Sequence, residues 1–573
     1  MKTVLLDSLG KIFPDEVVGN APENATMLRN ERLSFQIAFR LEPGEEAFLN
    51  ALSVSVESDI PVTEYRIGFV PVLKSCPKKH DSGFDRTTPG LYPDPLYRRN
   101  PDRFVKNQGN DAAPMWLEEN ENELLAAVED SWQGIWFTLN ENEDTISAGE
   151  HRVTVRFSNM YENKVIAEQS VSVKVIDARL PRQSVICTNW FHLDCLADHY
   201  GVEMFSDRNF EIIGSFMREA AANGQNMIML PSFTPPLDTT VGSERRTAQL
   251  IGVTVTDGGY EFDFTLFERY IKLALECGIE YFEHNHMFTQ WGASHAPKII
   301  ATVNGKEERI FGWETDAGDE KYEDFLRQYF AAMLPCAEKL GVKEKIFFHT
   351  SDEPDVRQIE DYSRASALMR ELTDGGTLFD ALSHYEFAQQ GTTDIPVVTV
   401  ESTGLEKFSS DGKPFWVYNT GAEIIADYPS RLITNKSVRN RMLGVMMYSI
   451  GASGFLNWGY NYYYDVLSHG RHDPSSYTGT FLQRPGASFI VYPSADGRAI
   501  PSLRMKVFHE AMTDHRALCL LEQLTSRDSV MKLIEAHFGR LGISYPMTDA
   551  ELLAFRRDVN AAIDAARGKR VAF

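Results

Sequence analysis

Two adjacent acidic residues that follow a short apolar run are the first candidates for chemistry in this chain. In "KIFFHTSDEP" the run 346–348 is followed by Asp352 and Glu353. Carboxyl groups serve as general acids, bases or nucleophiles. The chain has 81 Asp and Glu among 573 residues, so roughly eleven adjacent acidic pairs would arise by chance. Whether the pair is catalytic therefore depends on the element that positions it. Ser351 or Asp352 could equally be the N-cap of a helix with Pro354 in its first turn.

The bulk composition excludes several classes of partner. Hydrophobic residues make up 43% of the chain and charged residues 24%, which is typical of a globular protein of two to four domains. The net charge is 57 − 81 = −24, which argues against nucleic acid and anionic membranes as partners. A neutral substrate fits this charge best, and we expect no cofactor.

The chain shows no sign of secretion or membrane insertion. Its six cysteines have no C-x-x-C spacing, which is typical of reduced thiols. The start "MKTVLLDSLGKIFPDE" has a three-residue apolar run, too short for a signal peptide, and no window approaches 18 apolar residues. We expect a cytoplasmic protein, unless a processed leader has been removed, and the oligomeric state is not readable.

Residues 1–178 alternate apolar and polar side chains with a period of two. "RLSFQIAFRL", "HRVTVRF" and "SVSVKVI" each place their apolar residues on one face. Such runs, separated by polar turns, predict antiparallel strands with one buried face. We expect an N-terminal β-sandwich domain over residues 1–178.

Residues 179–500 change to short apolar runs that alternate with amphipathic segments. The segments "FERYIKLALECG" and "YEDFLRQYFAAMLPCAEKLG" have helical spacing and end at glycine. Eight strands in this pattern predict a (β/α)₈ TIM barrel, the catalytic domain. The predicted strands are 185–191, 226–230, 280–284, 345–350, 377–383, 396–400, 415–419 and 453–458.

Residues 501–573 are mainly helical. "SLRMKVFHEAMTDHRALCLLEQL" and "DAELLAFRRDVNAAIDAA" are long segments without strand-like alternation. We expect this C-terminal segment to complete or cap the barrel. The predicted fold class is therefore multidomain α and β: a β-sandwich, a TIM barrel and a helical C-terminal segment.

The acidic pair gains a location from the barrel. It follows the predicted strand 345–350, and TIM-barrel enzymes build their active sites at the C-terminal ends of the strands. Other predicted strands end in aromatic, histidine, amide and acidic residues of the kind that a neutral sugar requires, although any one of them alone could be structural. The substrate-binding candidates are Trp190, His192, Asp194, His284, His286, Trp291, Tyr385, Tyr418, Asn457, Trp458 and Tyr460.

Other chemistries have weaker support. His284 and His286 could be drawn as metal ligands with Glu283 and Asp194, but no further ligand has a recognisable spacing and no H-E-x-x-H is present. The chain also lacks a G-x-S-x-G nucleophile elbow and a P-loop. We expect no catalytic metal.

With these residues in view, the chain resembles glycoside hydrolase family 123, the β-N-acetylgalactosaminidases, and the related domain-of-unknown-function 4091 proteins. The resemblance runs nearly end to end, through "NERLSFQIAFR", "GIWFTLNENEDTISAGEHRVTVRF" with Trp136, "SDEP", and "GASFIVYPSADGRAIPSLRMKVFHEAMTDHRALCLLE". Ala487 stands where Asp is usual, and "HEAMTDHRAL" replaces the commoner "REGIQDYELL". These departures lie outside the acidic pair and indicate a divergent member.

The resemblance implies retaining hydrolysis in which the substrate supplies the nucleophile. The 2-acetamido oxygen of the sugar attacks the anomeric carbon and forms an oxazoline. Asp352 would accept the acetamido N–H, and Glu353 would protonate the leaving oxygen and later deprotonate water, its pKa raised by the neighbouring ionised Asp352. From their positions at the predicted strand ends, we expect Tyr385 or Tyr418 to reach the acetamido carbonyl and Trp458 to form the floor of the site. The implied partner is a neutral oligosaccharide or glycolipid glycan with terminal β-linked N-acetylgalactosamine.

Two alternatives remain open from the residues themselves. The barrel could hydrolyse a sugar without an acetamido group, or it could bind carbohydrate without turning it over. The preference for the galacto or gluco epimer depends on one or two side chains that the sequence does not place.

Overall fold

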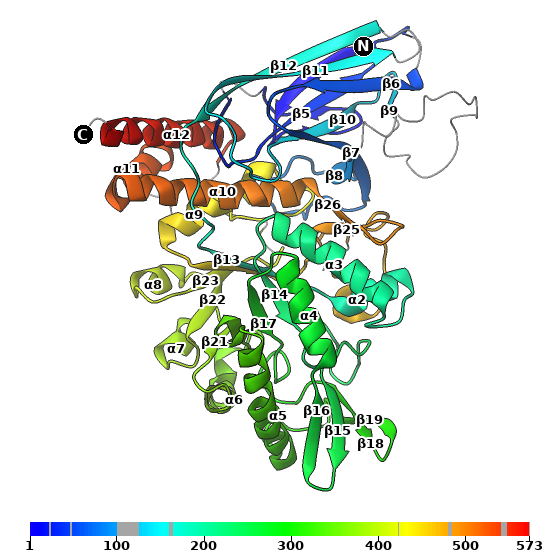
Figure 1. Cartoon of the computed structure of the whole chain (residues 1–573), viewed down its shortest axis with the longest axis vertical. Coiled ribbons are helices and arrows are strands. Elements are labelled where there is room, and N and C mark those ends of the chain that lie inside the picture. The colour runs from blue at the N-terminus through cyan, green and yellow to red at the C-terminus, as the bar shows by residue number, and fades with distance from the viewer. Residues whose placement is uncertain are drawn as a thin grey trace. The chain divides into compact units, whose positions relative to one another are not determined.

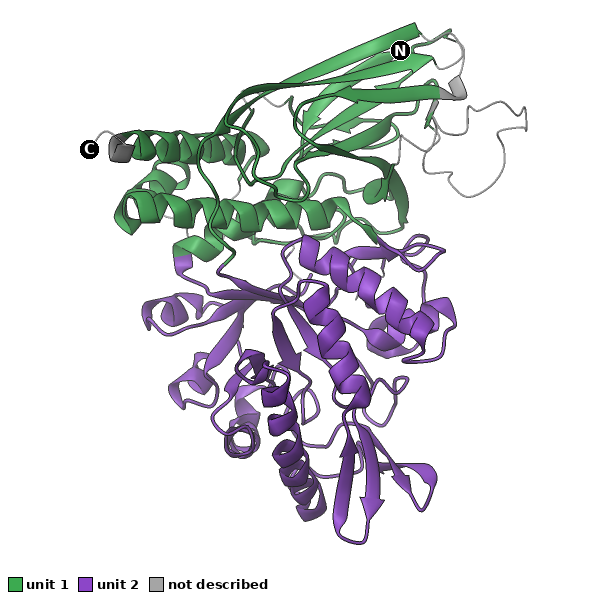
Figure 2. Ribbon diagram, in the orientation of Figure 1, with its two compact units in different colours: residues 1–183, 424–449, 500–573 green, residues 184–423, 450–499 purple. Residues whose placement is uncertain are grey.

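The computed structural model describes residues 1–21, 25–45, 48–99, 125–159, 164–421, 423, 425–479, 484–539 and 547–571. Contacts divide the chain into two compact units, coloured green and purple in Figure 2. Unit 1 consists of residues 1–183, 424–449 and 500–573, and unit 2 of residues 184–423 and 450–499. Each unit therefore combines segments that are distant in the sequence.

Two five-stranded sheets form the N-terminal part of unit 1 (Figure 1). Strands β5 and β11 carry the predicted alternation: Phe35 and Ile37 of β5 share a buried core with Val153 and Val155 of β11. The alternating sequences thus form a β-sandwich, as predicted. The first sheet has the order β1 (Lys2–Asp7), β5 (Leu33–Arg40), β10 (Gln133–Leu139), β7 (Val62–Val72), β8 (Gly90–Arg98), and the second β4 (Ala25–Leu28), β12 (Lys164–Ile176), β11 (Gly149–Asn159), β6 (Phe48–Glu57), β9 (Leu125–Ala127); β2 (Lys11–Ile12) and β3 (Val17–Val18) form a short pair.

The C-terminal helices pack in the same unit as the sandwich. Val507 and Leu518 share a hydrophobic core with Leu6, Ile67 and Trp136 of the first sheet. The segment 501–573, predicted to complete or cap the barrel, therefore belongs to unit 1 by its contacts, because its apolar face is buried there. The helices are α9 (Ser437–Ile450), α10 (Leu503–Leu524), α11 (Arg527–Phe538) and α12 (Asp549–Val571).

Unit 2 contains a closed barrel of eight parallel strands. The strands follow one another in chain order, and β24 closes the barrel by pairing with β13, from Ile186 opposite Gly454 to Asn189 opposite Asn457. The predicted β-sandwich, TIM barrel and helical C-terminal segment are confirmed. The barrel strands are β13 (Ile186–Asn189), β14 (Met227–Leu230), β17 (Tyr281–His284), β20 (Ile346–Phe348), β21 (Thr377–Ala381), β22 (Ile395–Thr399), β23 (Trp416–Tyr418) and β24 (Gly454–Asn457).

Helices follow most barrel strands, as the βα pattern predicts (Figure 1). The helices α4 and α5 end just before Gly278 and Gly341, whose positive φ values of 96° and 72° suit a left-handed C-terminal turn. The helices of unit 2 are α2 (Leu193–Tyr200), α3 (Asp207–Ala222), α4 (Thr265–Glu276), α5 (Glu320–Lys339), α6 (Ile359–Leu372), α7 (Tyr385–Gln389) and α8 (Leu405–Ser410).

A four-stranded sheet inserted among the βα loops was not predicted. It has the order β16 (Gly259–Asp263), β15 (Gly252–Thr256), β18 (Ile299–Val303), β19 (Lys306–Phe311), and further short strands are β25 (Val491–Pro493) and β26 (Ala499–Pro501). In the part of the chain that the structure describes, no helix is both long and apolar enough to span a bilayer.

Candidate active site

A cavity of about 280 Å³ contains the acidic pair. Asp352 and Glu353 enter it from the loop after β20, and the other lining residues come from the segments that follow further barrel strands or from the strand ends themselves. The cavity therefore lies where TIM-barrel enzymes assemble their active sites. Its lining consists of Trp190, Asp238, Gln290, Trp291, Asp352, Glu353, Ala381, Tyr418, Thr420, Gly421, Leu456, Trp458, Arg484 and Ala487.

The acidic pair does not cap the next helix. The side chain of Asp355 accepts the backbone N–H of Arg357, and Gln358 completes the capping box. Ser351 instead donates its hydroxyl to the carbonyl of Thr289 at 2.8 Å. Asp355 is thus the N-cap, a role that the sequence left open for Ser351 or Asp352. Asp352 and Glu353 do not have this role.

The two acids differ in exposure although they are neighbours in the chain. Asp352 is buried, whereas Glu353 is exposed to the cavity. Glu353 has a φ of +43°, a left-handed conformation that is uncommon outside glycine. The peptide N–H of Trp291 holds the carbonyl of Asp352 at 2.8 Å. With this backbone geometry both consecutive carboxyl groups line the same cavity, and each has different surroundings.

The carboxylate of Asp352 faces other acidic groups. No described residue donates a hydrogen bond to it. Burial raises the pKa of Asp352 well above its ordinary value, and the charges of Glu353 and Asp238 raise it further, while the charge of His349 lowers it. A group that donates a hydrogen bond to this carboxylate would favour its ionised form.

Tyr418 contacts the other acid. Its hydroxyl donates to Glu353 Oε1 at 2.6 Å and lies 3.4 Å from Ser383 Oγ. Burial, and then the charge of Glu353, raise the pKa of Tyr418 well above its ordinary value, so the phenol keeps its proton. Tyr418 therefore fixes the orientation of the Glu353 carboxyl group.

A histidine bonded to two carboxylates lies buried at the ends of β17, β20 and β21. His349 Nε2 lies 2.6 Å from Glu283 Oε1, and Nδ1 lies 2.7 Å from Asp380 Oδ1. Trp190 also donates to Glu283, and Tyr362 to Asp380, so both carboxylates are well supplied with donors. Two carboxylate acceptors require both ring nitrogens to carry protons.

The pKa of His349 agrees with this charged form. Burial would lower it, but the hydrogen bonds and charges of Asp380 and Glu283 raise it to about 9. His349 is therefore an imidazolium at neutral pH. Its positive charge partly offsets the negative charges of Glu283 and Asp380.

The same region is the best candidate for a metal site among the described residues. His286, His349 and Asp380 place ligand atoms within 4.8 Å of one another. Both nitrogens of His349, however, are already bonded to carboxylates, and its ring lies parallel to that of His286 with centroids 3.9 Å apart. In-plane lone pairs of stacked rings do not converge on one point, so these residues do not form a tetrahedral ligand set.

Four of the predicted substrate-binding residues line the cavity: Trp190, Trp291, Tyr418 and Trp458. Trp458 is anchored because its indole N–H donates to the carbonyl of Thr420 at 2.9 Å and its own carbonyl lies 3.0 Å from His192 Nε2. Trp291 is 47% exposed, which is unusual for so large an apolar side chain. The cavity thus offers aromatic surfaces beside the two acids.

Two predicted residues belong to a buried ion-pair cluster rather than to the lining. Arg245 contacts both carboxylate oxygens of Asp194, at 2.7 and 2.8 Å, and donates to His192 Nδ1 at 3.1 Å. Burial and the charge of Arg245 lower the pKa of His192 to about 3, so its ring is neutral. His192 therefore supports Trp458 from behind instead of contacting a ligand.

The other five predicted residues also lie away from the cavity lining. His284 lies 2.9 Å from Tyr329 of α5, and His286 stacks on His349. Tyr385 packs against Phe408 of α8 at 5.1 Å between ring centroids. Asn457 links the ends of β23 and β24, and Tyr460 donates to a carbonyl of α3.

Sequence reasoning missed several residues of the site. Asp238, Gln290, Thr420 and Arg484 line the cavity from loops, where no periodicity marks them. Glu283, His349 and Asp380 had a usable signal, because alternate residues of a barrel strand face inward and charged residues in buried strands need partners.

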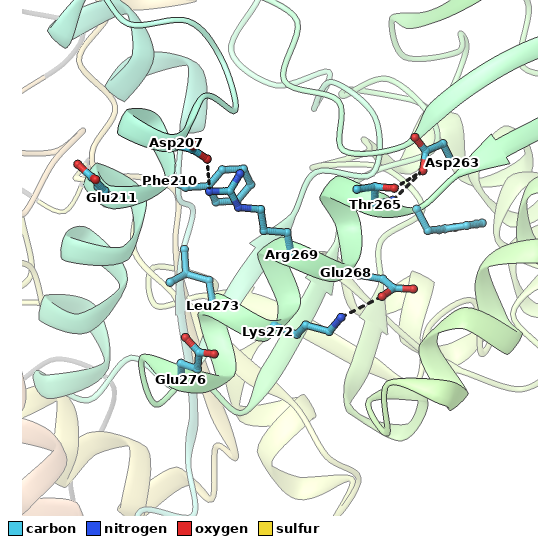
Figure 3. A pocket seen from close by; sticks show the side chains of 11 residues that line it. Asp207, Phe210, Glu211, Asp263, Thr265, Glu268, Arg269, Lys272, Leu273 and Glu276 are labelled. Carbon is cyan, nitrogen blue, oxygen red and sulfur yellow. Dashed lines mark hydrogen bonds and ion pairs between the residues drawn. The ribbon is translucent and has the colours of Figure 1, made fainter.

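A larger cavity of about 780 Å³ lies between α3 and α4 (Figure 3). These helices belong to the outer ring of the barrel, away from the ends of the strands. Both basic residues of its lining are already paired, Arg269 with Asp207 and Lys272 with Glu268. The smaller cavity around the acidic pair is therefore the candidate active site.

Comparison with known proteins places the chain in a family. The family model described as glycoside hydrolase 123, catalytic domain, matches residues 190–521. A solved family 123 glycoside hydrolase from Clostridium perfringens, analysed for glycolipid glycan hydrolysis, superposes with a TM-score of 0.72 at 12% identity and covers 100% of this chain and 99% of that chain. This likeness shows a shared fold. The chain matches no curated protein.

Other solved structures superpose poorly. A family 39 glycoside hydrolase from Bacteroides cellulosilyticus WH2 gives a TM-score of 0.28 at 10% identity, with 82% of each chain covered. A family 5 mannosidase from Rhizomucor miehei gives 0.30 at 12% identity, with 61% of this chain and 95% of that chain covered. Neither adds to the description of the fold.

Proposed function

Because the chain belongs to glycoside hydrolase family 123, we propose that it is a retaining, exo-acting glycosidase that removes terminal β-linked N-acetylgalactosamine with help from the acetamido group of the substrate. The family establishes a glycoside hydrolase; the sugar and the mechanism are the proposal. The observation that carries it is the pair of adjacent acids, one buried and unbonded, the other exposed and held by Tyr418.

An adjacent pair fits a mechanism in which the substrate supplies the nucleophile. Retaining glycosidases that use a protein nucleophile place two carboxyl groups across the sugar ring, about 5–5.5 Å apart. Asp352 and Glu353 follow one another on a single loop, so they approach the sugar from the same side. The acetamido oxygen of the sugar itself can attack the anomeric carbon from the opposite face.

The proposed reaction has two steps. First, the acetamido oxygen bonds to the anomeric carbon while the bond to the leaving oxygen breaks, and Glu353 gives that oxygen its proton. Second, Glu353 takes a proton from water, the water oxygen bonds to the anomeric carbon, and the oxazoline ring opens. Two inversions retain the configuration, and Glu353 ends protonated as it began.

Asp352 is proposed to accept the acetamido N–H. Its carboxylate has no other donor among the described residues, and a hydrogen bond from the N–H would stabilise its ionised form. The negative charge would in turn stabilise the positive charge that develops on the oxazoline ring. Asp352 would thus orient the nucleophile and offset its charge.

Tyr418 and the indole rings complete the proposed site. The single proton of the Tyr418 hydroxyl is bonded to Glu353 in the empty site, and it would turn to the acetamido carbonyl once Glu353 carries a proton. Trp190 and Trp458, with apolar Leu456, would contact the C–H face of the sugar. The cavity is near the lower limit of ligand pockets, roughly 300 Å³, which suits one terminal sugar.

The proposed substrate is a neutral oligosaccharide or a glycolipid glycan. The glycolipid class is carried over from the Clostridium perfringens enzyme as part of this proposal. The acidity of the cavity supports a neutral sugar, because Asp238, Asp352 and Glu353 all line it.

Hydrolysis of the 4-nitrophenyl β-glycosides of N-acetylgalactosamine, N-acetylglucosamine and galactose tests the proposal. We expect turnover of the first above the second and none of the third. Asp352→Asn should lose activity on every substrate, roughly 10²–10⁴-fold, whereas Glu353→Gln should lose most on poor leaving groups. Glu386→Gln, which alters an exposed acid of α7, is the control. Efficient hydrolysis of the plain galactoside would instead select a glycosidase that does not need the acetamido group.

A further inference from the structure

A third carboxylate lines the cavity and has no part in the proposed reaction. Asp238 lies in the segment after β14, whereas Asp352 and Glu353 follow β20, and all three line the same cavity. The negative charge of Glu353 acts on Asp238, and that of Asp238 acts on Asp352. Asp238 thus interacts electrostatically with both acids although it lies in a different loop.

The backbone of Asp238 is fixed on both sides. Its N–H donates to Gln290 Oε1 at 2.9 Å, and its carbonyl accepts the hydroxyl of Ser468 at 2.7 Å. The residue has a φ of +51°, a conformation that costs free energy unless the surroundings enforce it. Gln290 follows β17 and also lines the cavity, and Ser468 follows β24, so segments after two other barrel strands hold the backbone of Asp238 in place.

The carboxylate of Asp238 has acceptor capacity that the protein leaves unfilled. Its Oδ2 is buried and without a hydrogen-bond partner among the described residues. The charge of the nearby Arg245 favours the ionised form of Asp238, but its guanidinium is already bonded to Asp194 and His192. An ionised carboxylate can accept several hydrogen bonds and can donate none, so a ligand with hydroxyl groups would donate to Oδ1, the carboxylate oxygen that is not fully buried.

We propose that Asp238 is a specificity-determining residue: its carboxylate accepts hydrogen bonds from ring hydroxyls of the terminal sugar and restricts the site to N-acetylhexosamines whose hydroxyls carry no anionic substituent. The proposal rests on the proposed function and names the substrate class more narrowly. A sulfate ester on such a hydroxyl removes the donated proton and brings a negative charge against the carboxylate.

The charges around the cavity support this restriction. Arg484 is the one basic residue among the described residues of the lining, and it donates to the carbonyl of Gly421 and interacts with Glu423 and Glu401. Because Arg484 is already engaged, no described residue of the lining offers an unengaged cation to a sulfate, and the carboxylate of Asp238 repels an anionic sugar. Burial, opposed by Arg245 and reinforced by Glu353, raises the pKa of Asp238 to about 6, so its carboxylate is ionised at pH 8.

The test compares 4-nitrophenyl β-N-acetylgalactosaminide with its 6-O-sulfate and 4-O-sulfate at pH 8. Wild type should prefer the unsulfated sugar by at least about 100-fold in kcat/KM. In Asp238→Asn the KM for the unsulfated sugar should rise roughly 10- to 100-fold, with a smaller change in kcat. The preference for the unsulfated sugar over at least one of the two sulfated sugars should fall about tenfold or more. Asp257→Asn, at an exposed position of the same segment between β14 and α4, is the charge-matched control and should behave as wild type.

Calorimetric binding of N-acetylgalactosamine and its sulfates to the same proteins separates this inference from the proposed reaction. If wild type binds the sugar but does not hydrolyse its glycoside, the proposed function fails, and the ratio of dissociation constants still tests Asp238. An unchanged KM, dissociation constant and sulfate preference in Asp238→Asn would overturn the inference, as would wild type that binds no sugar. Thermal unfolding shows whether Asp238→Asn is folded. If it is not, the same measurements are made on Asp238→Ser.

Discussion

Asp352 and Glu353 are adjacent, but the protein gives them different surroundings. Burial and the like charges of Glu353 and Asp238 oppose ionisation of Asp352, while Glu353 is exposed and bonded to the Tyr418 hydroxyl. Division of roles between two carboxyl groups generally follows from such environments rather than from residue type. In the proposed reaction the substrate donates one hydrogen bond to Asp352.

The raised pKa of Asp352 predicts that its removal stabilises the protein. A carboxyl group whose pKa is raised by folding adds stability below its unfolded pKa of 3.8, and that stability is lost as the pH rises through the raised value. At pH 8, above its unfolded pKa, Asp352 therefore destabilises the fold, by up to about 1.4 kcal/mol for each tenfold increase in proton affinity that folding causes. Asp352→Asn should have a higher free energy of unfolding at pH 8, and the gain should vanish near pH 4.

Urea unfolding at both pH values measures this effect. Glu386→Gln, at an exposed position on α7, should change the free energy of unfolding by less than about 0.5 kcal/mol. An Asp352→Asn protein that is less stable than wild type at pH 8 would show that Asp352 has a structural role.

Some of the predicted site residues line the cavity and others do not, for a physical reason. The acidic pair and four aromatic residues lie at or after the ends of barrel strands, at positions that line the cavity. His284 also ends a strand, but it points to α5 while its neighbour Glu283 points inward to His349, because side chains alternate along a strand. Asp238 lies in a loop whose path no periodicity reveals.

Three neighbouring barrel strands are joined by the buried ion pairs of His349. Glu283 lies in β17, His349 follows β20, and Asp380 lies in β21. The imidazolium offsets two carboxylates at the level from which the loop of Asp352 departs. Its charge also acts on Asp352, so the same network that joins the strands favours the ionised form of the proposed assisting residue.

The pKa of His349, raised from 6.5 to about 9, predicts a pH dependence of stability. A histidine with a raised pKa contributes stability that is complete below 6.5 and is lost as the pH rises through 9. The wild-type free energy of unfolding should therefore fall by about 3 kcal/mol between pH 6.5 and 9.5. His349→Gln should lack this fall and should lose about 3–5 kcal/mol at pH 6.5, since Glu283 and Asp380 then lack a counter-charge.

Exposed His384→Gln is the control for this titration and should keep the wild-type pH dependence. The same decline in His349→Gln would mean that other groups titrate there. The network would then not be the source of the pH dependence.

Elements were easier to predict than residues. All eight barrel strands were predicted, because strands buried on both faces are nearly continuous apolar runs. The inserted sheet β15, β16, β18 and β19 was missed because much of it is exposed and charged, as in the "KEERIF" of β19. The grouping of the C-terminal helices depends on long-range contacts that local patterns do not encode.

Within the whole molecule, unit 1 is held together by ion pairs between residues far apart in the chain. Arg556 of α12 contacts Glu31 at 2.8 Å and Asp514 of α10 at 3.0 Å, and Arg441 of α9 contacts Asp514 at 2.8 Å. All four residues are buried or nearly so. The N-terminal sandwich and the C-terminal helices of unit 1 therefore depend on each other.

Arg556→Met should lower the free energy of unfolding by about 3–5 kcal/mol, because two buried carboxylates lose a partner. Arg567→Met on the same helix breaks a partly exposed pair with Asp177 and should cost less than about 1 kcal/mol. Chemical denaturation measures both. At 20 °C the folded fraction of Arg556→Met should keep wild-type kcat/KM, since every lining residue of the cavity belongs to unit 2; equal stability of the two variants would contradict the role of the buried pairs.

The central claim is that the substrate's acetamido oxygen is the nucleophile, and one series of substrates tests it most directly. Hydrolysis rates are measured for 4-nitrophenyl β-glycosides whose N-acyl group is acetyl, fluoroacetyl, difluoroacetyl or trifluoroacetyl. Fluorine withdraws electron density from the carbonyl oxygen, so the account predicts that kcat/KM falls at each step and by at least about 100-fold, or about 2.7 kcal/mol of activation free energy, across the series. Rates that stay level from acetyl to trifluoroacetyl would show that the acetamido oxygen does not attack, and the proposed roles of Asp352 and Glu353 would fall with it.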